Sequence, residues 1–124
     1  MGNILELIEE IRQYGINNNV PIMSVETIET INKIISENKI HSVLEIGTAI
    51  AYSTICFASN KNIDKVVSIE RDDIREKIAI SNVEKSNLKN ITLIHDDALN
   101  TEINDKFDLV IIDAAKSQNT KFFN

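Results

Sequence analysis

The 124-residue sequence has a single cysteine and no long hydrophobic stretch, and each shortage excludes a class of protein. Cys56 cannot form an internal disulfide, which favours a reducing compartment such as the cytoplasm, and we expect it to be a small core residue of a helix. No hydrophobic stretch approaches the roughly 20 residues that a membrane-spanning helix needs. The first residues do not combine a basic region with an apolar segment, so a secretory signal is not expected.

Positive charge is also scarce. The chain has 13 lysines and arginines against 19 acidic residues, which gives a net charge of −6. The lysines are scattered and no aromatic residues alternate with them, so the composition lacks the basic footprint of a typical nucleic-acid-binding protein. A hydrophobic fraction of 43% and a charged fraction of 26% are ordinary for a globular protein. The length allows one domain at most, with a core of its own.

The first forty residues have the spacing of two helices. Asn3, three residues before a glutamate, is typical of a helix N-terminus, and we expect this helix to stop near Gly15. A linker then extends to Pro21. Ser24 is a favourable N-cap for a second helix, whose apolar positions continue to about Glu37.

From residue 41 onward, short apolar runs alternate with helical patterns. We expect strands at 41–46, 65–69, 91–94 and 107–112, and helices at 52–59 and from Asp72 or Asp73 to Ser86. This alternation predicts an α/β fold with a parallel sheet covered on both faces. We therefore divide the chain into a helical segment, 1–40, and the N-terminal part of a ligand-binding domain, 41–124. The sequence stops just after the fourth strand, so we expect a partial sheet with an apolar edge strand.

Residues 43–53 read Val-Leu-Glu-Ile-Gly-Thr-Ala-Ile-Ala-Tyr-Ser, which predicts a strand, a tight turn and a helix. In an open α/β sheet, nucleotide-like ligands bind at such strand ends. Glu45 would repel phosphate, and the single Gly47 departs from G-x-G-x-x-G, so an NAD or FAD site is disfavoured. A carboxylate suits a positively charged ligand, and the sulfonium and amino group of S-adenosylmethionine fit. Thr48 and Ser53 add hydroxyls suited to a ligand carboxylate.

Three more acids follow the later strands. Glu70, Asp97 and Asp113 each come just after an apolar run, so with Glu45 they place four carboxylates along one edge of the sheet. The spacing from Gly47 to Glu70 is close to the roughly 20 residues at which an acid binds ribose hydroxyls. Alternatively, each acid caps the helix that follows its strand.

Several segments together resemble the bacterial branch of the catechol and caffeoyl-CoA O-methyltransferase family. They are residues 45–53, Ile69-Glu70-Arg71, residues 107–118 with Lys121-Phe122-Phe123, and Val20-Pro21-Ile22-Met23. The resemblance covers nearly the whole chain. It implies a Rossmann-like class I methyltransferase fold, S-adenosylmethionine as cofactor, a divalent metal such as Mg²⁺, and methylation of a hydroxyl oxygen. It also implies 5-hydroxyuridine in tRNA as substrate, with small catechol-like compounds as the alternative. We further expect a homodimer.

The resemblance assigns roles to individual residues along the strand ends. The cofactor would be bound by Glu45, Gly47 and Thr48 along its methionine part, Tyr52 and Ser53 at its carboxylate, Glu70 at the ribose, Arg71, Asp97 and Ala98 around the adenine, and Asp113 beside the methyl group. Asp113 would also be the metal ligand. Lys116 would be the general base, with an ordinary surface lysine as the alternative.

Two residues depart from the family pattern. Ala51 and Asp96 stand where the family usually has glycine, and a methyl group at residue 51 would crowd the turn. The family completes its metal site with an Asp-Asn pair beyond the fourth strand, which this sequence does not reach. We therefore expect the chain alone to be a weak enzyme. The alternatives are a non-catalytic S-adenosylmethionine-binding fragment and, less favoured by the single glycine, an NAD-type oxidoreductase domain.

Overall fold

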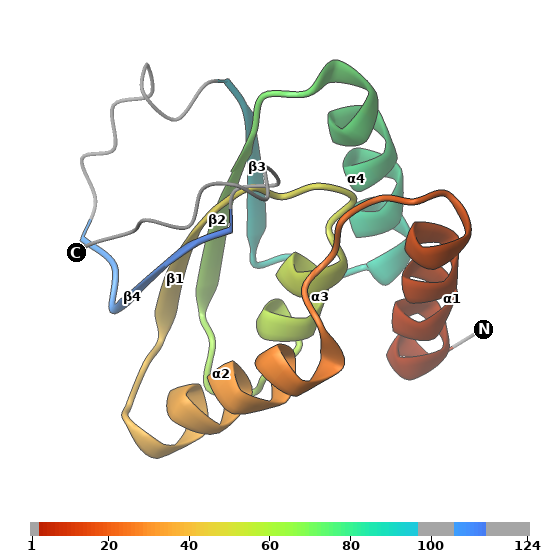
Figure 1. Ribbon diagram of the computed structural model, residues 1–124. Helices are drawn as coiled ribbons and strands as arrows, with labels where there is room; N and C mark the ends of the chain where they lie inside the picture. Colours follow the sequence, from red (N-terminus) through yellow and green to blue (C-terminus); the bar gives the residue numbers. More distant parts are fainter. Residues whose placement is uncertain (1–2, 97–105, 114–124) are drawn as a thin grey trace.

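A computed structural model of the chain describes residues 3–96 and 106–113 (Figure 1). Helices and strands follow in the order α1 (Ile4–Asn17), α2 (Val25–Glu37), β1 (Ser42–Ile46), α3 (Tyr52–Ala58), β2 (Lys65–Glu70), α4 (Asp73–Ser86), β3 (Ile91–His95) and β4 (Leu109–Ile112). The predicted alternation from residue 41 is confirmed. Among the described helices, none combines the length and the apolar character needed to cross a membrane.

The four strands form one parallel sheet in the order β3-β2-β1-β4. In the register of the central pair, Glu45 of β1 lies opposite Ser68 of β2, and on the other side of β1 it lies opposite Ile111 of β4. Because all four strands run the same way, their carboxyl ends meet at one edge of the sheet. The α/β class and the parallel sheet are therefore as predicted.

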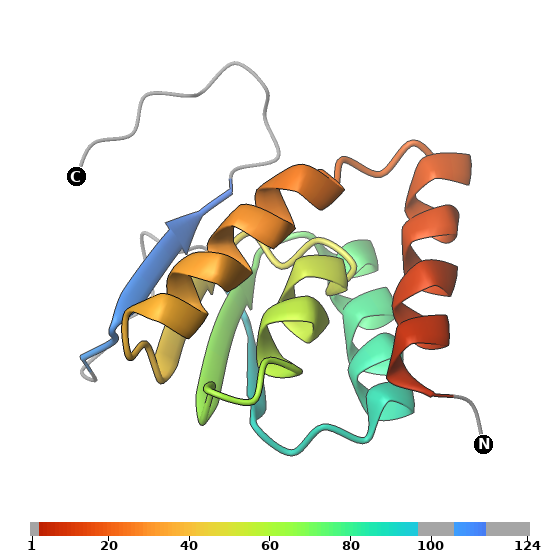
Figure 2. The ribbon, with the colours of Figure 1, turned by 90° about the horizontal axis from the view of Figure 1, so that it is seen from below.

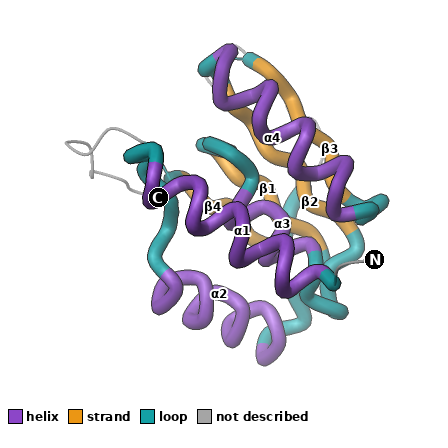
Figure 3. Tube along the Cα trace, turned by 90° about the vertical axis from the view of Figure 1, so that its right-hand side faces the viewer, coloured by secondary structure: helices purple, strands orange, loops and turns teal. Residues whose placement is uncertain are grey.

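All four helices lie on one face of this sheet, as Figures 1 and 2 show from two directions and Figure 3 from a third. The main core fills the space between helices and sheet, with Ile35, Ile55 and Phe57 fully buried. The other face carries a smaller cluster formed by Leu44, Val67 and Ile69. The expectation that helices cover both faces is thus not met within the described residues. The right-handed connections through α3 and α4 place both helices on the same side.

The end of α1 differs from its prediction. Gly15 does not stop the helix, which continues to Asn17, and the expectation of a glycine C-cap is wrong. Gly15 is buried, and a Cβ atom there would lie 3.2 Å from the side chain of Ile22. The glycine therefore serves the close packing of the α1–α2 connection. Asn18 ends the helix, and its side-chain amide donates to the carbonyl of Tyr14 at 2.8 Å.

The predicted helix starts are confirmed. The Asn3 side chain accepts the backbone N–H of Glu6 at 2.9 Å, and Ser24 Oγ accepts that of Thr27 at 3.1 Å. On α4, Asp72 is the N-cap. These short polar side chains satisfy N–H groups that have no partner within the helix.

Candidate functional site

The site is built around the turn between β1 and α3. Gly47 has a φ of +104°, and a Cβ atom there would lie 2.1 Å from the backbone oxygen of Asp113. The backbone N–H groups of Gly47 and Thr48 both donate to the carbonyl of Ile69, at 2.9 and 3.2 Å. The Asp113 N–H donates to the carbonyl of Ile46 at 2.8 Å. Only glycine fits at residue 47, because any side chain would collide with the end of β4.

Two alanines complete the turn in left-handed conformations. Ala49 has a φ of 52° and Ala51 a φ of 75°, and the Ala51 N–H donates to the carbonyl of Thr48 at 2.9 Å. This bend points the Ala49 N–H at Glu70 Oε1, 2.7 Å away. The glycine usual at residue 51 in the family matches this geometry, since a left-handed backbone favours glycine. The Ala51 methyl is fully buried.

Glu70 lies at the end of β2 with 7% of its surface exposed. Its Oε1 accepts the Ala49 N–H, and its Oε2 accepts the Asp72 N–H at 3.0 Å. The cap of α4 is Asp72 and not Glu70. Each carboxylate oxygen can accept more than one hydrogen bond, so Glu70 keeps acceptor capacity for ligand hydroxyls beside the turn.

Glu45 is fully buried beneath the turn. Its carboxyl accepts hydrogen bonds from the hydroxyls of Ser53, of Thr54 at 2.5 Å and of Ser68 at 2.7 Å. Burial raises the pKa of Glu45, and the three hydroxyl donors oppose that rise. The Glu45 side chain is therefore held by the chain's own hydroxyls, and its predicted contact with a ligand stays a prediction.

A small pocket opens where the turn meets the α1–α2 connection and the end of β4. It is lined by Pro21, Ile22, Met23, Gly47, Thr48, Ala49, Tyr52, Ser53 and Asp113. Three resemblance-bearing segments of sequence thus meet at one place, including residues 21–23, which are far from the turn in sequence. A larger groove between α1 and α4, lined by Leu7, Ile11 and Ile78 among others, contains none of the predicted site residues.

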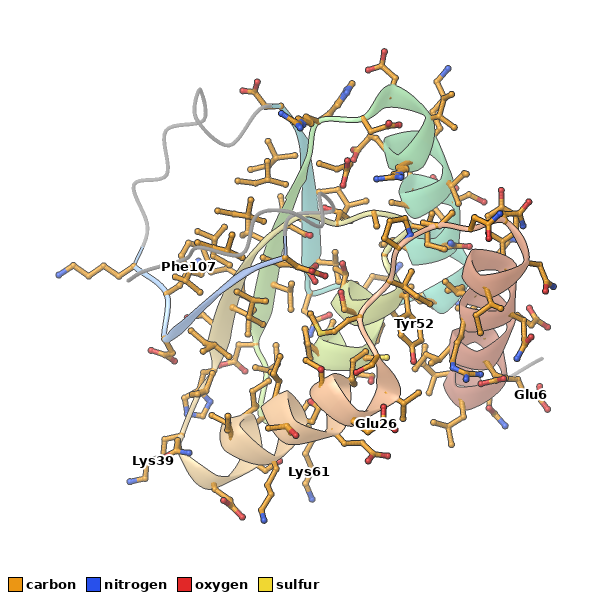
Figure 4. All side chains as sticks on the ribbon, in the orientation of Figure 1. Glu6, Glu26, Lys39, Tyr52, Lys61 and Phe107 are labelled. Carbon is orange, nitrogen blue, oxygen red and sulfur yellow. The ribbon has the colours of Figure 1, made fainter. Side chains whose placement is uncertain are left out.

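The first residues of α3 contribute differently to this pocket. The Ser53 hydroxyl donates its only proton in a hydrogen bond to the Glu45 carboxyl. Tyr52 is almost fully buried and faces α1, as Figure 4 shows. Burial raises the pKa of its phenol. Of the nearby charges on α1, Arg12 lowers this pKa and Glu9 raises it. Further along α3, Cys56 is buried in the main core, so the predicted core role of this thiol is confirmed, and burial raises its pKa to about 12.

The remaining predicted residues are less closely grouped. Asp113 is partly buried at the pocket, and desolvation raises its pKa. Arg71 is exposed beside Glu70. Asp97, Ala98 and Lys116 lie outside the described residues, and Asp96 is the last residue described before that gap.

The described part of the site supplies few ligands for a divalent cation. Within residues 3–96 and 106–113, no group of three or more His, Cys, Asp or Glu side chains could hold a metal ion. Asp113 supplies one carboxylate, whereas Mg²⁺ requires six ligands in near-octahedral geometry.

Two residues of the site escaped the sequence prediction. Thr54 and Ser68 both bind the Glu45 carboxyl, and Ser68 also contacts the hydroxyl of Thr48 at 2.6 Å. A signal is present in the sequence, because Ser68 is a small polar residue within the apolar run 66–69. Its partner could be found only from the strand register, in which it lies opposite Glu45.

Comparison with known proteins decides the family. A family model described as O-methyltransferase matches residues 3–124. The chain belongs to this family. A putative caffeoyl-CoA O-methyltransferase from Staphylococcus aureus is 37% identical, with a TM-score of 0.81 over 90% of this chain and 55% of that one. An O-methyltransferase from Bacillus cereus, solved in complex with SAH, is 28% identical, with a TM-score of 0.76 over 88% of this chain and 54% of that one.

The chain is also similar in sequence to a curated protein. The probable ribosomal RNA small subunit methyltransferase A of Methanosphaera stadtmanae is 32% identical over 90% of this chain and 41% of its own length. The chain therefore spans about half the length of these solved structures and less than half of the curated relative. The predicted Rossmann-like fold of S-adenosylmethionine-dependent methyltransferases is confirmed, and the O-methyltransferase family with it.

Proposed function

We propose that this chain binds S-adenosylmethionine and forms the cofactor-binding part of an O-methyltransferase. The observation that carries the proposal is the 2.7 Å contact between the Ala49 N–H and Glu70 Oε1. It joins the turn to a nearly buried acceptor at the end of the neighbouring strand. A ligand whose methionine part lies against the turn at Gly47 and Ser53 would then reach Glu70 with its ribose.

The residues present fit such a ligand. Gly47 keeps the turn free of a side chain, Glu70 offers carboxylate oxygens to two ribose hydroxyls, and Asp113 places a carboxyl at the pocket. The acids suit the positive charges of the sulfonium and the amino group. When bound, the cofactor supplies the methyl group. Thr48, Tyr52, Ser53 and Arg71 are proposed to complete its binding, together with Asp97 and Ala98.

Metal assistance and the proton acceptor remain proposals from the family resemblance. Asp113 would be one ligand of Mg²⁺, and Lys116 would accept the proton of the substrate hydroxyl. The described residues supply only one of the ligands that such a metal needs. We expect the chain alone to bind cofactor with little or no turnover. Measurable methyl transfer by the purified chain with Mg²⁺ and S-adenosylmethionine would contradict this expectation.

For the substrate of the whole protein, we propose 5-hydroxyuridine in tRNA, as in the bacterial tRNA 5-hydroxyuridine methyltransferase. Small catechol-like hydroxyl compounds are the alternative. Assays of the full-length protein on tRNA containing 5-hydroxyuridine and on catechol distinguish the two. We also propose a homodimer in the cytoplasm.

Calorimetric titration with S-adenosylhomocysteine tests the cofactor proposal. We expect Glu70→Ala to weaken binding at least tenfold, because hydrogen bonds to a charged acceptor contribute about 1.5–3 kcal/mol. Glu84→Ala, an exposed position on α4, is the matched control and should bind as the unmodified chain does. Equal affinity of Glu70→Ala and the unmodified chain would remove the ribose role of Glu70. Binding of NAD in place of S-adenosylhomocysteine would support the oxidoreductase alternative.

A further inference from the structure

The hydroxyl of Ser68 connects two parts of the site that are distant in sequence. It donates to Glu45 Oε1 at 2.7 Å and lies 2.6 Å from the Thr48 hydroxyl. A serine hydroxyl has one proton, and Ser68 gives that proton to the carboxyl. Thr48 must therefore be the donor in the second bond. The result is a directed chain of hydrogen bonds that runs from Thr48 through Ser68 to Glu45.

This chain follows from the backbone. Parallel pairing places Ser68 directly opposite Glu45, so the two side chains lie on the same face of the sheet. The turn then folds back over the end of β2, because the N–H groups of Gly47 and Thr48 both bind the carbonyl of Ile69. That return brings Thr48 above Ser68. The three polar groups are fully or almost fully buried, so water does not compete for their hydrogen bonds.

The same carboxyl also holds a second residue that lines the pocket. Glu45 binds the hydroxyl of Ser53 directly, and it reaches Thr48 only through Ser68. Thr48 and Ser53 both line the pocket, whereas Ser68 and Glu45 are not among its lining residues. We propose that Ser68 is a positioning residue that sets Thr48 and the turn for cofactor binding without contacting the cofactor. This inference rests on the proposed function of the pocket.

The chain offers a matched control for Ser68. Thr54 donates to the same oxygen, Glu45 Oε1, at 2.5 Å, and its side chain is also fully buried. Thr54 does not line the pocket, and within the described residues its hydroxyl bonds Glu45 and not Thr48. Ser68→Ala and Thr54→Val therefore each remove one hydroxyl donor from Glu45. Only the first of them disconnects Thr48.

The experiment combines thermal unfolding with titration by S-adenosylhomocysteine. We expect both variants to lower the Tm by similar amounts. Ser68→Ala should weaken binding about fivefold to tenfold, as expected for one lost hydrogen bond, whereas Thr54→Val should bind within about twofold of the unmodified chain. Unchanged binding by Ser68→Ala, or an equal loss in Thr54→Val, would overturn the proposal.

A double-mutant cycle adds a readout that a merely structural role would not move. If Ser68 acts through Thr48, then Ser68→Ala causes no further loss of affinity once Thr48→Val is present. If the double variant instead loses affinity by the product of the two separate effects, the proposal is overturned. Ser68→Cys, nearly isosteric with a weaker hydrogen-bonding group, gives the same comparison if Ser68→Ala does not fold. If the unmodified chain binds no S-adenosylhomocysteine, the proposed function itself fails, which is distinct from a failure confined to Ser68.

Discussion

At the scale of single residues, Ala51 is the position where this chain departs most clearly from favourable backbone geometry. Its φ of 75° lies in the left-handed region, which costs an L-residue other than glycine about 1–2 kcal/mol. Its methyl is fully buried, and that burial offsets about 0.8 kcal/mol. The strain persists because the surrounding turn is fixed by hydrogen bonds to β2 and to Glu70.

We therefore predict that Ala51→Gly leaves the free energy of unfolding unchanged or raises it by up to about 1 kcal/mol. The matched control is Ala79→Gly, because Ala79 is equally buried but lies within the right-handed helix α4. There glycine should lower the free energy of unfolding by about 1 kcal/mol or more. Denaturant unfolding of both variants measures the difference. An equal loss of stability in the two would contradict the role of backbone strain at Ala51.

A second prediction at this scale concerns Glu45 and pH. Burial raises its pKa above the ordinary value of 4.5, so the folded chain binds more protons than the unfolded chain just above that pH. Stability contributed by the neutral carboxyl is therefore lost as the pH rises through the raised pKa. Glu45→Gln cannot titrate. We expect the Tm of the unmodified chain, measured relative to Glu45→Gln, to fall as the pH increases from about 4 to 8. A constant difference would indicate an unshifted pKa.

At the scale of elements, the N-terminus of α4 supports the site from the side of β2. Asp72 Oδ1 accepts the N–H groups of Ile74 and Arg75, both at 2.9 Å, while its own N–H binds Glu70. The hydrogen bond from the Arg75 backbone is the main cause that lowers the pKa of Asp72. The cap therefore fixes the first turn of α4 next to the carboxyl that is proposed to bind the ribose.

Substitutions at the N-caps of two helices separate the contribution of charge to stability from that of hydrogen bonding. We expect Asp72→Ala and Ser24→Ala each to lower the free energy of unfolding by about 1 kcal/mol at neutral pH. A carboxyl with a lowered pKa stabilises the fold above its unfolded pKa, and that contribution is lost as the pH falls through the folded pKa. At acidic pH, the loss of unfolding free energy caused by Asp72→Ala should shrink, whereas the loss caused by Ser24→Ala should persist. Unfolding of the variants at pH values from about 2 to 7 measures this, and parallel behaviour would refute it.

At the scale of the whole molecule, the helices cover one face of the sheet and leave apolar side chains on the other. Val110 and Ile112 of β4 are 50% and 46% exposed on that face. Within the described residues, β4 pairs only with β1, so one of its edges has no strand beside it. An exposed apolar edge strand tends to associate with another chain.

We therefore expect copies of this chain to associate in solution through β4. Sedimentation should show species larger than a monomer, and Val110→Lys should reduce them because a lysine on an edge strand opposes pairing. Ile74→Lys serves as the control, since Ile74 on α4 is 71% exposed but lies on the helical side. A monodisperse monomer, or an equal effect of the two substitutions, would contradict the prediction.

Much of the architecture follows from local sequence patterns. The caps at Asn3 and Ser24 and the strand ending at Ile46 were predictable because they depend on neighbouring residues. The role of Gly15 was not predictable, because a glycine near a helix end is usually a C-cap, whereas here its role comes from contact with Ile22. The sheet face without helices was also not predictable, because near-continuous apolar strands do not reveal which face a helix will cover.

The sequence by itself determined the order of elements, the turn at Gly47 and the acids that follow the strands, because periodicity, capping and glycine spacing are local properties. Only the tertiary structure decided what those groups touch. It directed Glu45 into the protein towards three hydroxyls, and it joined Glu70 to the turn through Ala49. It also linked Thr48 to Ser68. These contacts depend on the register of parallel strands, in which a shift of one residue would reverse the face of every side chain.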